Sequence, residues 1–236
     1  VSYQTAWLKA NHPVAFLAAS MTLDMDKTDK LAGHMQEATR LGISVLPPDI
    51  NKSGAEFLTE CEEDGTPAIV GLQAMKELVA CREKHGGRFE SLAEFADCVD
   101  PKLLNKMQIE NLAKAGAFDR LEPSRARLVA GAELILRRAQ ATAEDRASSQ
   151  IGLFGGGDAK PEPLRLPNVP EWPQLEKLAF EAEAVGFHLS AHPLDTYAAV
   201  LKRLGVVPSA EIAARARAGG TRLKLAGTVV ASKERN

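Results

Sequence analysis

The sequence predicts a mainly α-helical protein with a small β element, and three observations support this fold class. Apolar residues recur every three or four positions over most of the 236 residues, as they do on the buried face of helices. Between residues 43 and 70, short runs bounded by turn residues have the composition of strands instead. A stretch rich in glycine and proline, residues 155–173, divides the helical part and predicts a flexible linker.

Composition places the chain among ordinary globular proteins. The hydrophobic fraction is 45% and the charged fraction 25%. No apolar run approaches the roughly 18 residues that a membrane span requires, and no secretory signal pattern is found at the start, so we expect a cytoplasmic location. The 29 basic residues balance 31 acidic ones, so any contact with DNA must come from a local patch rather than from an overall field.

The N-terminal part predicts three helices. Tyr3 and Trp7 are four residues apart, and Pro13 has the place of a first-turn proline, so residues 1–22 are expected to form a helix pair. A third helix follows from Asp26 and ends at Gly42, which is expected to be a left-handed cap.

The helical pattern stops at ISVLPPDI, and a small β element is expected next, with two short strands in the runs AEFLTE and PAIVG. Asp64-Gly65, between the last two, is a hairpin turn signal. Helical spacing resumes at Leu72 and continues to Gly86-Gly87, and a capping box is formed by Ser91 and Glu94.

Two further helices complete the predicted helical array. Asp100-Pro101 is expected to begin a helix that runs through Leu104, Met107 and Leu112 to Gly116, and Pro123 to open the next, with Leu128, Ala132, Ile135 and Leu136 facing inward. Beyond the linker, Leu175 to Val185 predict a helix capped by Gly186. Short helices near Tyr197–Leu204 and after Ser209 precede a final strand, LKLAGTVVA.

Neither a metal site nor a catalytic site is predicted. Cys61, Cys81 and Cys98 lack zinc-ligand spacing and are expected to be buried, reduced thiols. Asp24, Asp26 and Asp29 fail the spacing of a calcium loop and are interpreted as helix-capping carboxylates. His188 and His192 are interpreted as packed or capping side chains, because Gly186 and Pro193 interrupt a helix through both. No nucleophile motif or phosphate loop is found.

Two stretches could bind a partner. Lys102, Lys106 and Lys114 lie on helices next to Gly116, where a glycine turn can direct backbone N–H groups at a DNA phosphate; the residues alone favour a solvated helix face instead. The apolar residues of QIGLF, 150–154, stand in polar surroundings. They form either a short strand that packs back or a peptide for a partner's groove.

Several stretches together resemble the alpha subunits of bacterial DNA polymerase III, the replicative C-family polymerases. They occur in the family's order and near its spacing: VSYQTAWLKANHPVAFLAASMT, LPPDIN, LNKMQIENLAKAGAFD, QIGLF and GFHLSAHPLDTY. The resemblance implies a segment of a DNA-directed DNA polymerase, a nucleotidyltransferase of DNA replication that uses Mg²⁺. The catalytic carboxylates then lie upstream of Val1, so no catalytic or metal-binding residue and no cofactor is assigned here.

The resemblance also implies a domain order. The expected parts are the end of the fingers at 1–42, a strand-bearing region with the helix-hairpin-helix DNA-binding domain at 43–121, a helix at 122–145, a linker at 146–172, a helical connector at 173–208 and the start of an OB domain at 209–236. Within the linker, the residues that match the internal sliding-clamp motif are Gln150, Ile151, Leu153 and Phe154. The implied partners are DNA, the sliding clamp and the other subunits of the replicative holoenzyme.

The sequence departs from the family after GLQAMK. There the family continues through a glycine-rich first hairpin, whereas this chain passes directly to ELVACREKHGG, so the first hairpin is expected to be missing and the second, near LAKAGAF, to remain. A rival interpretation is a stand-alone noncatalytic adaptor that binds clamp and DNA in repair. The absence of an initiator Met and the unpartnered final strand favour a piece of a longer chain.

Overall fold

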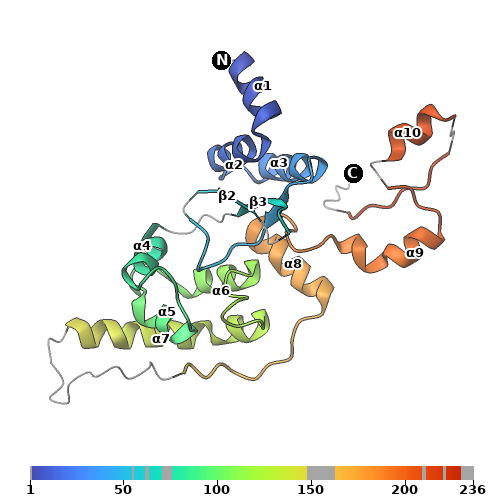
Figure 1. Cartoon of the computed structure of the whole chain (residues 1–236). Coiled ribbons are helices and arrows are strands. Elements are labelled where there is room, and N and C mark those ends of the chain that lie inside the picture. The colour runs from blue at the N-terminus through green and yellow to red at the C-terminus, as the bar shows by residue number, and fades with distance from the viewer. Residues whose placement is uncertain are drawn as a thin grey trace, which may run out of the picture. The chain divides into compact units, whose positions relative to one another are not determined.

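A computed structural model describes residues 2–54, 56–61, 64–70, 76–147, 163–208, 211–219 and 222–229. The contacts divide the chain into two compact units, Val1–Leu189 and Ser190–Asn236. Helices predominate and a small sheet accompanies them, which confirms the predicted fold class (Figure 1). None of the helices in the described ranges is long and apolar enough to cross a membrane.

The three N-terminal helices form as predicted. They are α1 (Ser2–Asn11), α2 (Pro13–Leu23), which has its proline in the first turn, and α3 (Thr28–Arg40). Gly42 follows with a φ of 71°, the left-handed conformation expected of a helix cap. Leu17, Met21 and Leu31 are buried here and pack with Ile69 of the sheet. No residue of α1 is buried.

The β element is a three-stranded sheet with the order β1-β3-β2. Its strands are β1 (Ser44–Leu46), β2 (Leu58–Cys61) and β3 (Pro67–Val70). β3 pairs in parallel with β1 and antiparallel with β2. The predicted turn joins β2 and β3, because Gly65 has a φ of 84° and the Asp64 Oδ1 atom accepts a hydrogen bond from the Thr66 amide at 2.9 Å.

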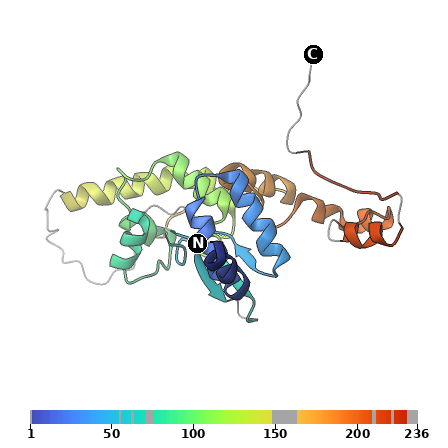
Figure 2. The same cartoon turned by 90° about the horizontal axis from the view of Figure 1, so that it is seen from above.

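The helical array consists of α4 (Lys76–Lys84), α5 (Leu92–Cys98), α6 (Lys106–Ala115) and α7 (Arg125–Ala147). In both views α7 runs alongside α5 and α6 (Figure 1 and Figure 2). The core between them contains Phe89, Phe95 and Phe118, which pack edge to face. Ser91 caps α5 as predicted, since its Oγ accepts a hydrogen bond from the Glu94 amide.

The start of α6 differs from the prediction. The helix begins at Lys106 rather than Pro101, because Asn105 and Gln108 exchange hydrogen bonds between side chain and backbone and so form a complete capping box. Residues 101–103 form a turn in which the Asp100 carboxylate accepts a hydrogen bond from the Lys102 amide at 2.9 Å. Met107 therefore lies in the first helical turn with 68% of its surface exposed, while Leu104 and Leu112 are buried.

The cysteines also differ from the prediction. Cys81 of α4 and Cys98 of α5 are joined by a disulfide across a Cα–Cα distance of 6.0 Å, because the packing of the two helices brings their chain positions within bonding range. Cys61 is a free thiol and is exposed on β2. The expectation of three buried, reduced thiols is therefore wrong.

Residues 163–173, which belong to the predicted linker, pack on α7. Leu166 is 9% exposed and joins the core of the helical array, together with the partly buried Leu164. Gly131 of α7 permits this approach, since a Cβ atom at that position would overlap the Leu166 side chain. α8 (Gln174–Val185) follows and ends at Gly186, whose φ is 92°, as predicted.

The Ser190–Asn236 unit contains a 3-10 helix, η1 (Pro193–Tyr197), and the short helices α9 (Ala198–Arg203) and α10 (Ile212–Arg217). The predicted final strand is not formed over residues 222–229. There the backbone makes one isolated bridge, from Lys224 to Val206, because no neighbouring strand supplies a ladder.

Candidate nucleic-acid interface

The connection between α6 and α7 is the hairpin to which the family resemblance assigns a DNA contact. Gly116 ends α6 with a φ of 88°, and its amide bonds to the Ala113 carbonyl. The next residue, Ala117, donates to the Leu112 carbonyl at 2.9 Å and accepts from the Ile50 amide at 2.8 Å. These bonds fix the hairpin both to its own helix and to the segment that follows β1.

A buried arginine organises the hairpin. Arg125, the first residue of α7, is 1% exposed. Its Nε and Nη2 atoms donate to the Asp119 carboxylate at 2.9 and 2.7 Å. Its Nη1 atom donates to the Lys114 carbonyl at 3.0 Å and to Glu181 Oε2 at 3.1 Å. One side chain thus joins the last turn of α6, the hairpin, α7 and α8.

Glu181 completes this buried network from α8. Its side chain is fully buried, and its Oε1 atom accepts a hydrogen bond from the Leu189 amide. Burial alone would lower the pKa of Arg125, but the hydrogen bonds and negative charges of Asp119 and Glu181 outweigh it and raise that pKa. Arg125 therefore keeps its positive charge, and the buried network stabilises the hairpin only while all its partners are present.

Two features of the structure require a glycine at position 116. Its backbone lies in the left-handed region, which L side chains rarely adopt. In addition, a Cβ atom there would stand 2.7 Å from Cζ of Arg125 and 2.9 Å from the Asp119 carboxylate. Gly116 thus shapes the hairpin and lets the arginine lie beneath it.

Lys114 is held within the molecule. Its Nζ atom lies 2.9 Å from Glu183 Oε1 and 5.2 Å from the centre of the Phe180 ring, both on α8. The lysine side chain is only 15% exposed, whereas that of Glu183 is 62% exposed. A phosphate that reached Lys114 would have to displace this carboxylate.

Lys102 and Lys106 are open to solvent. The Lys106 side chain is 54% exposed and stands 3.8 Å from Glu110 at the i,i+4 position. Lys102 is exposed in the turn before α6. The capping box occupies the Asn105 and Gln108 amides, so a ligand at this helix end would meet the two lysine side chains rather than those N–H groups.

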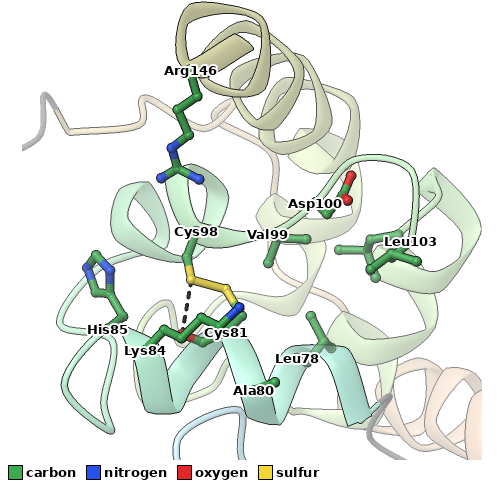
Figure 3. Close-up of a pocket in the computed structure, with 11 residues that line it drawn as sticks. Leu78, Ala80, Cys81, Lys84, His85, Cys98, Val99, Asp100, Leu103 and Arg146 are labelled. Atoms are coloured by element: carbon green, nitrogen blue, oxygen red, sulfur yellow. Dashed lines mark hydrogen bonds between the residues drawn. A yellow bond between two sulfur atoms is a disulfide. The ribbon is translucent and has the colours of Figure 1, made fainter. Parts of the chain in front are cut away.

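A cavity of about 500 Å³ lies between α4, α5 and the end of α7 (Figure 3). Lys84, His85 and Arg146 line it around the Cys81–Cys98 disulfide, and Leu78, Val99 and Leu103 form an apolar wall. Three helices end at or next to residues that line the cavity, at Lys84, Cys98 and Ala147, and Arg146 donates to the Asp97 carbonyl at 2.6 Å. The cations therefore compensate the negative helix ends.

The acidic and histidine motifs have structural partners. Asp24 lies 3.0 Å from both Lys27 and Lys30, and the hydrogen bonds from these lysines lower its pKa to about 2. The His188 ring contacts the Leu178 carbonyl, and His192 Nδ1 accepts a hydrogen bond from the Leu194 amide. Over the described ranges, no group of three His, Cys, Asp or Glu residues could hold a metal ion. Gln150, Ile151, Leu153 and Phe154 lie outside the described residues.

Comparison with known proteins supports the assignment of the hairpin. The family model of the helix-hairpin-helix motif matches residues 42–128. The whole chain is 46% identical to the DNA polymerase III subunit alpha of Caulobacter vibrioides, and 99% of it is 37% identical to that of Vibrio cholerae. A third relative, from Deinococcus radiodurans, is 42% identical over 84% of the chain.

The chain is homologous to one segment of the DNA polymerase III alpha subunit. It covers 21%, 20% and 15% of the lengths of these three relatives, a fifth or less in round terms. The helix-hairpin-helix match ends at residue 128, so the α8 residues that hold the hairpin, Phe180, Glu181 and Glu183, lie beyond it. Neither Arg125 nor these α8 residues were predicted from the sequence. One signal was present: Glu181 stands three residues after Leu178, on the apolar face of its helix.

Proposed function

We propose that this segment holds duplex DNA for a replicative DNA polymerase and tethers that polymerase to the sliding clamp. The observation that carries the proposal is similarity to DNA polymerase III alpha subunits along the whole chain, together with the helix-hairpin-helix match. Nucleotidyl transfer, with Mg²⁺ as its metal, belongs in this proposal to other parts of the polymerase. The segment contributes binding rather than chemistry, alongside the other holoenzyme subunits.

DNA binding is assigned to the exposed approach to α6. Lys102 and Lys106 are free to contact phosphates, and such contacts carry no sequence information, so the binding is nonspecific. Gly116 keeps the hairpin backbone close to its buried support. Lys114 contributes only where DNA displaces Glu183.

The test is the salt dependence of binding to a labelled DNA duplex. Replacing both Lys102 and Lys106 by Gln removes two phosphate contacts, so the slope of log K against log salt should fall by about 1.8. The control is Lys27→Gln with Lys30→Gln, which removes the same charge beside Asp24. If the wild-type chain does not bind duplex DNA even at low salt, this role is refuted.

Clamp binding is assigned to Gln150, Ile151, Leu153 and Phe154. Burial of the apolar side chains favours docking, at roughly 25 cal/mol per Å², but the loss of chain and translational freedom opposes it. An affinity on the order of micromolar follows for the peptide alone. When the segment also contacts DNA, clamp binding becomes intramolecular and its effective affinity rises.

Clamp binding is tested by a pull-down with a purified bacterial sliding clamp. Replacing Leu153 and Phe154 by Ala should abolish capture, because both apolar anchors are lost. The control is Leu175→Ala, which truncates an exposed leucine on α8. Capture that survives the double replacement contradicts the assignment.

A further inference from the structure

The Cys81–Cys98 disulfide has no part in the proposed function, yet it forms part of the wall of a cavity. Both cysteines are partly buried at the edge of the helical core. Both also line the cavity of about 500 Å³ between α4, α5 and the end of α7 (Figure 3). A disulfide that a small thiol can reach is exchanged more readily than an enclosed one. The position of this disulfide is therefore that of an exchangeable bond.

Basic side chains line the same cavity. Lys84 and His85 follow Cys81 by three and four residues, at the end of α4, and Arg146 comes from the last turn of α7. All three basic residues are exposed. The guanidinium group of Arg146 is held in place, because it donates to the Asp97 carbonyl at 2.6 Å. Cations from two helices thus surround one disulfide.

The rest of the lining sets the kind of ligand that fits. Among the described lining residues the one acid is Asp100, and its carboxylate already accepts a hydrogen bond from the Lys102 amide at 2.9 Å. Positive charge therefore outweighs negative charge, and the cavity attracts anions. Leu78, Val99 and Leu103 supply the apolar wall. A small molecule with carboxylates and a short apolar part matches both properties.

We propose that Cys81 and Cys98 form a thiol–disulfide exchange site for a small anionic thiol, of the class of the γ-glutamyl tripeptides that contain cysteine. Lys84 and Arg146 bind its carboxylates and bring its sulfur to the disulfide. The thiolate of the small molecule attacks one cysteine sulfur, so that a new S–S bond forms and the Sγ–Sγ bond breaks. The other cysteine leaves as a thiolate, which the same cations stabilise.

A second molecule of the thiol completes the reaction. Its thiolate attacks the mixed disulfide and releases the symmetrical disulfide of the small molecule. Two electrons pass from the two small thiols to the protein disulfide, and the two protons that these thiols lose are taken up by the cysteine thiolates. The reverse reaction, with the symmetrical disulfide as oxidant, restores the bond. The covalent link between α4 and α5 is made or removed in this way, while α4 stays attached through Arg82, which donates to the Ile50 and Ser53 carbonyls at 3.1 and 3.0 Å.

The experiment measures how fast thiols of different charge reduce the disulfide in the full chain. Cys61→Ser is the background, so that the exposed thiol of β2 takes no part. The probes are glutathione, which is negatively charged, and mercaptoethanol, which is neutral, and alkylation followed by mass spectrometry gives the reduced fraction. Replacing Lys84 and Arg146 by Gln should lower the ratio of the two rate constants, glutathione over mercaptoethanol, by about three- to tenfold, because the attraction of the anion is lost. About 1 M salt should lower the wild-type ratio in the same direction.

The ratio cancels the intrinsic reactivity of each thiol and any general change in access to the disulfide. The matched control, Lys27→Gln with Arg40→Gln, removes the same charge from positions outside the cavity lining and should leave the ratio within about twofold of the wild type. Lys84→Gln alone leaves the bond of Arg146 intact and should still lower the ratio.

Three results would overturn the inference. The first is a ratio that does not change in the double variant. The second is a chain that neither thiol reduces until urea unfolds it, since the disulfide is then out of reach. The third is an air-oxidised chain in which Cys81 and Cys98 are alkylated without a reductant. None of these results bears on the DNA and clamp binding of the proposed function, which are measured separately.

Discussion

The helix-hairpin-helix region and the Ser190–Asn236 unit differ in how many of their cations are held in internal ion pairs. In the first, Arg125 and Lys114 are held by carboxylates and largely withdrawn from solvent, whereas Lys102 and Lys106 are exposed. In the second, five of the six described Lys and Arg residues are exposed without an acidic partner. The difference teaches that the number of basic residues in a region does not measure its attraction for a polyanion. What counts is how many of them lack an internal partner.

The largest loss of stability is expected for Arg125→Leu. This change leaves Asp119 and the fully buried Glu181 without their cation, so the free energy of unfolding should fall by about 3–5 kcal/mol. Urea unfolding followed by circular dichroism measures it. The matched change in the other unit, Arg217→Leu, removes an exposed arginine and should cost less than about 0.5 kcal/mol. Equal losses in the two variants would contradict the contrast.

A smaller effect is expected for Gly116→Ala. The left-handed conformation costs an L residue about 1–2 kcal/mol, and the added Cβ also overlaps Arg125, so we expect a loss of about 2–3 kcal/mol. Gly87→Ala is the control, because Gly87 has a φ of 86° but open space around its Cβ position. Thermal unfolding compares the two. If both variants lose the same stability, the overlap between Arg125 and a Cβ atom at position 116 contributes nothing to the loss.

The smallest effect concerns Asp97, which binds Arg138 at 2.7 Å and Thr142 at 2.9 Å. Burial alone would raise its pKa, but these hydrogen bonds lower it below the usual 3.8. Its carboxylate therefore stabilises the fold above about pH 4, and this contribution is lost as pH falls through the lowered pKa. Asp97→Asn should cost about 1 kcal/mol at pH 7 and almost nothing near pH 2.

The control for Asp97 is Glu211→Gln in the second unit. The Glu211–Arg215 pair is more than half exposed, so its loss should change stability by less than about 0.5 kcal/mol at any pH. Unfolding curves across pH 2–7 test both variants. A loss for Asp97→Asn that persists undiminished at pH 2 would show that the carboxylate charge is not its cause.

Local signals predicted much of the fold. Pro13, Gly42 and Gly186 mark helix ends as expected, because each acts through its own backbone conformation. The start of α6 was misplaced because two adjacent signals competed, and the reciprocal bonds of Asn105 and Gln108 determined the outcome. The cysteine pair depends on how α4 packs against α5, which spacing along the chain does not encode.

The candidate site was less predictable than the fold. Lys114 and Lys106 look alike in the sequence, yet Lys114 is covered by α8, a helix some sixty residues further along the chain. Residues 190–236 have a positive net charge, but the negative net charge of residues 1–189 cancels it when charge is summed over the whole chain. Counting by compact unit requires the fold.

The packing of residues 163–173 on α7 sets a geometric limit for the segment before them. Ala147 and Pro163, the described residues on either side of 148–162, both belong to the Val1–Leu189 unit. Phe154 is seven residues past Ala147 and can stand at most about 25 Å from it. If the proposed clamp contact forms, a clamp bound at Phe154 is therefore held near the end of α7 and not on a long tether.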